Sequence, residues 1–116
     1  LITTQNARIL MPADVRNYAY DGYPKFSDID LCISHVWAGG NALSEELYMP
    51  KLREFISFMA KFRAKKYFLT HLYEIGRCER YMWHDGHADI VKDRLKDILP
   101  KTSVEVPRLG EGYSIF

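Results

Sequence analysis

The chain has 116 residues, of which 47% are hydrophobic and 27% are charged, which is the composition of one globular domain with its own core. Its 16 basic and 15 acidic residues leave a formal charge of +1, which argues against an extended polyanion-binding surface and allows only a local basic patch. Cys32 and Cys78 are too few for a disulfide framework, and no stretch reaches the ~18 apolar residues of a membrane span. We therefore expect a cytoplasmic protein without membrane association. Because the first residue is Leu1, either the start has been removed or the chain is part of a longer one.

The first part of the chain predicts two strands separated by a turn-rich connection. Residues 7–11 form a short apolar segment that stops at Pro12, which is typical of a strand ending in a loop, and this loop carries Asp14. Residues 18–27 are rich in Tyr, Gly, Pro and Asp and predict turns. The apolar run 30–34 predicts a strand buried on both faces, with His35 directly after it.

A helix and a further strand follow a loop at residues 36–43. Ser44 suits a helix N-cap, but Pro50 favours a regular helix that begins near the proline itself. The apolar face of this helix recurs at spacings of three and four, at Leu52, Phe55, Ile56, Met59 and Phe62. Residues 67–70 predict a second buried strand, which ends at His71, and residues 72–82 predict a connector.

The last third of the chain predicts a second helix and a terminal hairpin. The helix is expected from His84 or Asp85 to about Leu99, before Pro100. Its inward-facing residues are expected to be Ala88, Val91, Leu95 and Ile98. Residues 104–106 and 113–116 predict two short strands. Strands that alternate with helices imply an α/β fold, and we expect residues 1–116 to form a single unit.

Three polar residues come soon after predicted strands. Ligand sites in open α/β sheets lie outside the carboxyl ends of strands, so Asp14, His35 and His71 are expected to approach each other. Carboxylate and imidazole together suit Zn²⁺, Mn²⁺ or Fe. A structural interpretation stays open as well, because Asp14 can cap a turn and His71 can be a hydrogen-bonded structural residue. His84 and His87, three residues apart, are expected at a helix start and on the surface.

Three segments resemble motifs of the metallo-β-lactamase-fold hydrolases. Residues 68–72, Phe-Leu-Thr-His-Leu, with Arg77 six residues after the histidine, resemble the family's last metal-ligand motif, in which a strand ends in Thr-His. Residues 9–14, Ile-Leu-Met-Pro-Ala-Asp, resemble its strand-to-aspartate motif, and residues 30–33 resemble its internal strand. The resemblance spans nearly the whole chain. It implies an α/β fold that is the C-terminal half of a four-layer αββα sandwich, with a mixed sheet and two main helices.

The resemblance also implies metal-assisted hydrolysis, with zinc, or else manganese or iron, as one or two ions. Asp14 would bridge two metals about 3.5–4 Å apart and orient the attacking water, while His71 would complete the second metal site. Arg77 would hold an anionic substrate, with a phosphoester preferred, or pair with a structural carboxylate. His35 would orient a neighbouring ligand or transfer a proton.

Two departures from the family pattern matter. The main metal motif, His-x-His-x-Asp-His, and the histidine that normally precedes the bridging aspartate are absent from these 116 residues. Residues 34–37 read Ser-His-Val-Trp, where the tRNA-maturing zinc nucleases of the family have His-Glu-Ala-Thr. We therefore expect a fragment that self-associates and is inactive without the missing N-terminal half, and that acts on a small-molecule or phosphoester substrate when complete. The alternative is a non-catalytic α/β binding or interaction module that lacks a working metal site.

Overall fold

The described part of the chain is built around one mixed β-sheet. The computed structural model describes residues 1–12, 15, 17–19, 21–36, 45–73 and 75–115. In this part of the chain, five strands pair in sequence order: β1 (Ile2–Thr3), β2 (Arg8–Leu10), β3 (Leu31–His35), β4 (Lys66–Thr70) and β5 (Ser103–Glu105). β1 is antiparallel to β2, and the pairs β2–β3, β3–β4 and β4–β5 are parallel. The expected α/β class, with a mixed sheet and two helices, is therefore confirmed.

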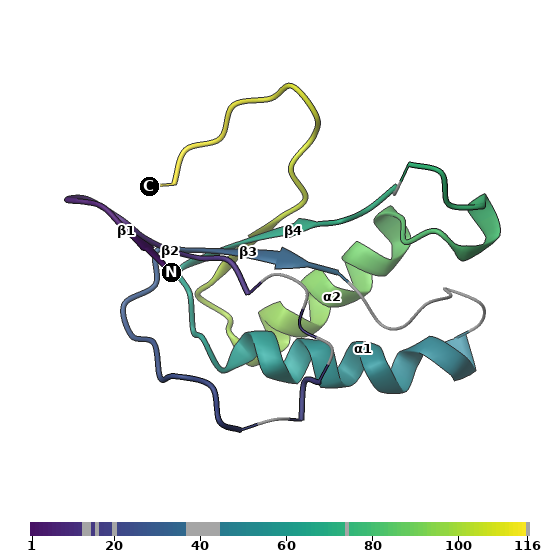
Figure 1. Cartoon of the computed structure of the whole chain (residues 1–116), viewed down its shortest axis with the longest axis horizontal. Helices are drawn as coiled ribbons and strands as arrows, with labels where there is room; N and C mark the ends of the chain where they lie inside the picture. The colour runs from purple at the N-terminus through teal and green to yellow at the C-terminus, as the bar shows by residue number, and fades with distance from the viewer. Residues whose placement is uncertain (13–14, 16, 20, 37–44, 74, 116) are drawn as a thin grey trace.

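Both helices cover the same face of the sheet (Figure 1). Helix α1 (Glu45–Ala60) connects β3 to β4, and α2 (Asp85–Ile98) connects β4 to β5, after a short 3-10 helix, η1 (Glu79–Tyr81). Crossovers between parallel strands are right-handed, so strands that follow one another in a single direction place successive helices on one side. The described helices lack the length and apolar content that a bilayer crossing requires.

The core lies between this sheet face and the helices. Cys32, Tyr67 and Val104 occupy paired positions on three adjacent strands, and all three side chains are buried. In β4 the burial alternates, because Tyr67 and Leu69 are buried while the residues between them are partly exposed. The prediction of a fully buried strand at 67–70 is therefore wrong in part, since both helices pack on one face only.

Helix α1 presents the apolar face that its sequence predicts. Leu52, Phe55, Ile56, Met59 and Phe62 are all buried, as expected from their spacing, although the helix ends at Ala60 and Phe62 lies in the turn after it. The helix nevertheless begins at Glu45, so Pro50 lies inside it rather than at its start. Pro50 has no backbone N–H, so the hydrogen bond that this position would make to the preceding turn is missing, and the helix continues past it. Ser44, the predicted N-cap, lies outside the described residues.

Helix α2 and the C-terminal segment depart from the sequence prediction at their ends. Ala88, Val91 and Leu95 are buried, but Ile98, in the last position of the helix, is 52% exposed. Residues 113–115 are not a strand, so the predicted terminal hairpin is wrong for the described residues. The segment instead lies over the sheet face opposite the helices (Figure 1), with the rings of Tyr113 and Phe68 5.3 Å apart. The two-residue strand β1 was not predicted.

The buried hydroxyl of Tyr67 joins the end of α1 to β4. It donates a hydrogen bond to the backbone oxygen of Met59 (2.7 Å) and accepts one from the backbone N–H of Ala64 (3.2 Å). The backbone oxygen of Ala64 in turn accepts a hydrogen bond from the Thr102 hydroxyl, just before β5. One phenol group therefore holds the corner from which β4 and β5 both start.

We expect Tyr67→Phe to lower the free energy of unfolding by about 1–3 kcal/mol, because it leaves a buried donor and a buried acceptor unsatisfied. Urea denaturation followed by circular dichroism measures the change. Tyr113→Phe is the matched control, since its hydroxyl bonds are exposed. An equal loss in both variants would contradict this role for Tyr67.

Candidate functional site

The carboxyl ends of the parallel strands bring two of the predicted site residues together. His35 is the last residue of β3, and His71 comes directly after β4. Their imidazole rings stack, with centroids 5.4 Å apart and planes 24° from parallel. The register explains this approach, because His35 is paired with Thr70 and the backbone N–H of Val36 donates to the Thr70 oxygen (2.9 Å). Asp14 lies outside the described residues, so its distance from the histidines is not part of this geometry.

The backbone at His71 adopts the left-handed region, with φ of 69°. Tyr73, two residues on, is also left-handed, with φ of 53°. Non-glycine residues adopt this region rarely, and it persists only where surrounding contacts impose it. Those contacts come from the approach to α2: the Tyr73 N–H donates to the backbone oxygen of Trp83 (2.9 Å), and the Tyr73 hydroxyl accepts from the N–H of Asp85 (3.4 Å). His71 is therefore held at the edge of the sheet by a loop anchored to the start of α2.

A groove of about 1020 Å³ opens beside His71 at the same edge. Its walls come from the end of β4, from the first half of α2 and from the segment after β5. The residues with polar or charged side chains that line it are Thr70, His71, Tyr73, Asp85, Asp89, Lys92 and Arg108. The hydrogen bond with the Asp85 side chain raises the pKa of the Tyr73 hydroxyl. The sequence analysis did not identify the groove residues in α2 or after β5. The rule that ligand sites lie outside the carboxyl ends of strands, which pointed to His71, also applies to the segment after β5.

Arg77 does not line this groove. It lies in the turn before η1, where it is half-buried and engaged by other groups. Its side chain is therefore not one of the cations that face the space beside His71. Lys92 and Arg108 occupy that place instead.

His84 and His87 form a reciprocal cap at the start of α2. The Nδ1 of His84 accepts a hydrogen bond from the N–H of Gly86 (3.1 Å), and the Nδ1 of His87 accepts one from the N–H of His84 (3.2 Å). The prediction of a helix start is confirmed, but the prediction of a surface position is wrong for His87, which is only 5% exposed. Its ring lies 4.6 Å from that of Trp83. Burial, followed by the charge of His84, lowers the pKa of His87 to about 4.

The two stacked histidines alone do not complete a metal centre. Among the described residues, no group of three or more His, Cys, Asp or Glu side chains is placed to hold an ion. A protein zinc site normally uses three or four such ligands. His35 and His71 supply at most two, and the described part of the chain contributes no third.

Comparison of this chain with known protein families, with curated proteins and with solved structures gives no match. The resemblance to metallo-β-lactamase-fold hydrolases therefore depends on the short motifs and on their order along the chain.

The buried cap predicts a pH-dependent stability. The folded-state pKa of His87, about 4, lies below its ordinary value of 6.5, so the unfolded chain binds more protons between these values. The stability that the neutral, buried His87 contributes is fully present above pH 6.5 and is lost as the pH falls towards 4. In His87→Gln the amide oxygen still accepts from the N-cap N–H, but the side chain does not titrate. We therefore expect this variant to lose about 1–3 kcal/mol less unfolding free energy than the wild type over this pH range.

Urea unfolding at several pH values between 7 and 4 measures this difference. His84→Asn keeps a hydrogen-bond acceptor at the N-cap of α2 and serves as the control. This variant should still lose most of the stability that the wild type loses at low pH. Identical pH profiles for wild type and His87→Gln would refute the assignment.

Proposed function

We propose that this chain is the C-terminal half of a metal-dependent hydrolase of the metallo-β-lactamase type and that it carries one side of the active site. The observation that carries the proposal is the stacking of His35 and His71 at the carboxyl edge of parallel strands, beside a groove. His71 occupies the Thr-His position of the family's last metal motif. The stacking adds a second imidazole to that position, which the motif alone does not require.

The sheet face opposite the helices also supports the proposal. Ile9 and Leu31 are paired on that face, as are Ile33 and Phe68 at the next positions, and neither helix covers them. Leu31 is buried, and the other three are partly exposed beside the C-terminal segment, whose Tyr113 ring contacts Phe68. An αββα sandwich buries this face of each sheet against the other sheet. An apolar outer face is therefore the surface expected of one half of such a sandwich.

The proposed metal site would hold one or two ions, zinc or else manganese or iron, with Asp14 and His71 as the ligands from this chain. Such ions lower the pKa of a bound water and polarise the scissile bond. His35, stacked on His71, limits the rotation of its ring and is close enough to take up or deliver a proton. The loop through Tyr73 fixes His71 against the start of α2, so the ligand position is set before metal binds.

For the substrate we propose a small molecule or phosphoester that enters the groove beside His71. Lys92 and Arg108 line this groove, and guanidinium and ammonium groups both suit phosphate. We assign recognition of the anion to these two residues rather than to Arg77, which lies outside the groove. By itself the chain is expected to be inactive, because the His-x-His-x-Asp-His ligands are absent from it.

The alternative is a non-catalytic α/β binding module. The count of ligands favours it, since the described residues offer two histidines where a zinc site needs three or four protein ligands. The two proposals differ in whether His71 binds a metal ion and in whether the sheet face opposite the helices drives self-association in solution. Two measurements separate them.

The first measurement is a titration of the 116-residue chain with Zn²⁺ by calorimetry. We expect weak binding that falls at least about tenfold in His71→Ala, because one of the few ligands is lost. His84→Asn removes a histidine elsewhere and keeps the helix cap, so it should bind like the wild type. Tight stoichiometric binding by the wild type would refute the proposal that this chain carries only part of a metal site. Equal binding by wild type and His71→Ala would favour the non-catalytic module.

The second measurement is sedimentation velocity over a range of protein concentrations. We expect the wild type to self-associate through this partly exposed sheet face and Phe68→Ser to associate less, because it removes apolar side-chain surface from that face. Ile98→Ser is the control, since this exposed residue lies on α2, on the other side of the sheet. A wild type that stays monomeric at all concentrations would favour the binding module.

A further inference from the structure

A second pocket lies at the end of the molecule away from His35 and His71. It is formed by the loop at residues 21–26, by Phe58 in the last turn of α1, and by Lys61 and Phe62 in the turn that follows the helix. Helix α1 leaves the carboxyl edge of the sheet after β3 and returns before β4, so its last turns lie at the amino edge of the strands. The pocket has a volume of about 380 Å³, which is within the range of small-molecule sites.

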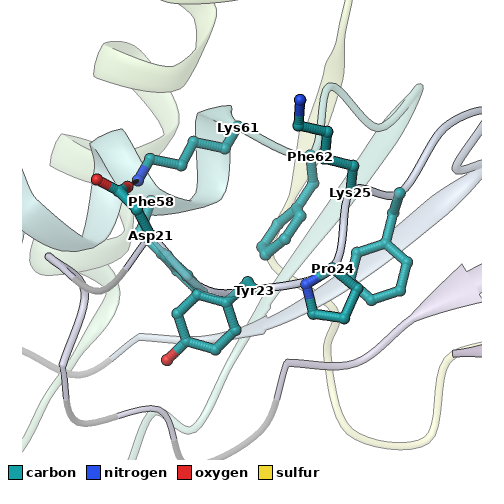
Figure 2. Close-up of a pocket in the computed structure, with 8 residues that line it drawn as sticks. Asp21, Tyr23, Pro24, Lys25, Phe58, Lys61 and Phe62 are labelled. Carbon is teal, nitrogen blue, oxygen red and sulfur yellow. Dashed lines mark hydrogen bonds and ion pairs between the residues drawn. The ribbon is translucent and has the colours of Figure 1, made fainter.

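Aromatic rings form the walls of this pocket (Figure 2). The apolar lining consists of Tyr23, Pro24, Phe26, Phe58 and Phe62. Tyr23 meets Phe58 edge to face at 5.0 Å, Phe58 meets Phe62 at 5.0 Å, and Phe26 lies 6.1 Å from Phe62. The rings support each other from both chain segments, so the walls are fixed before any ligand binds. Their exposed faces and edges suit a flat ring system.

The rim of the pocket is polar and positively charged. Lys61 makes an ion pair with Asp21 (2.7 Å), which neutralises one lysine and lowers the pKa of the aspartate. Lys25 is exposed and has no carboxylate partner in the part of the chain that the structure describes. Figure 2 shows the side chains of Lys61 and Lys25 on the same side of the pocket, with Phe62 between them. The rim therefore carries a net charge of +1 from two cations and one anion.

We propose that this pocket binds a small planar aromatic anion, with its ring against the aromatic walls and its acidic group at the lysine rim. The walls stabilise the ring by stacking and edge contacts, which do not depend on the identity of the ring. The rim selects the charge, because an anion is attracted by the Lys25 ammonium group, a cation is repelled by it, and a neutral ring gains nothing from it. The site is independent of the hydrolase proposal, since no residue of the pocket belongs to the groove beside His71.

The experiment is a titration of the ¹⁵N-labelled chain with naphthalene-2-sulfonate, followed by two-dimensional NMR. We expect saturable shifts at the amides of residues 21–26 and 58–62. Naphthalene-2-sulfonamide has the same ring without the charge and should bind about three- to fivefold more weakly, as expected for one exposed charge pair. Equal affinity for the two probes, or shifts only at residues 69–75 and 106–110, would overturn the proposal.

Three variants test the pocket itself. Lys25→Gln should weaken sulfonate binding about three- to fivefold and leave sulfonamide binding unchanged. Tyr23→Leu should weaken both probes about tenfold, because it removes one aromatic wall. Lys51→Gln is the control: it removes one exposed positive charge of α1 that lies outside the pocket, and it should change neither affinity. Lys25→Gln and Lys51→Gln with equal effects on the sulfonate would show general charge attraction and would refute a defined site.

Discussion

The parallel pairing of β2, β3, β4 and β5 in sequence order is the constraint on which the rest of the structure depends. Each crossover must return the chain to the amino edge of the sheet, so the loop that follows each parallel strand begins at the carboxyl edge. Right-handed crossovers then place α1 and α2 on one face and leave the other to the C-terminal segment. The stacked histidines, the groove and the apolar face opposite the helices all follow from this single arrangement.

The two edges of the sheet have different chemistry for the same reason. At the carboxyl edge, the loop after β4 is anchored by a backbone hydrogen bond to the residues just before α2. His71 and Tyr73 have left-handed backbone conformations there. At the amino edge the chain turns from α1 into β4 around the Tyr67 hydroxyl, and aromatic side chains line the pocket between that turn and the loop at 21–26. One edge presents polar groups and a groove; the other presents a rigid aromatic pocket.

The sequence predicted those features that depend on local pattern. The helical face of α1 and the three buried residues of α2 follow from spacing alone, and the approach of His35 to His71 follows from the strand-end rule. Features set by distant partners were not predictable. Ile98 has the spacing of a buried residue but is 52% exposed, while His87 has the pattern of a surface residue and is buried against Trp83. Residues 113–115 look like a strand, yet they contact a sheet face through Tyr113 rather than a sheet edge.

The backbone at His71 helps to weigh the functional interpretation of this residue against the structural one. A left-handed conformation costs an L-residue of this size roughly 1–2 kcal/mol, and glycine would occupy the same turn without that cost. A histidine needed only for hydrogen bonding would gain little by sitting there. The conformation places its ring against that of His35 at the mouth of the groove, so the strain has a chemical consequence at that place. This favours a residue that is positioned to bind or react over one that merely completes the fold.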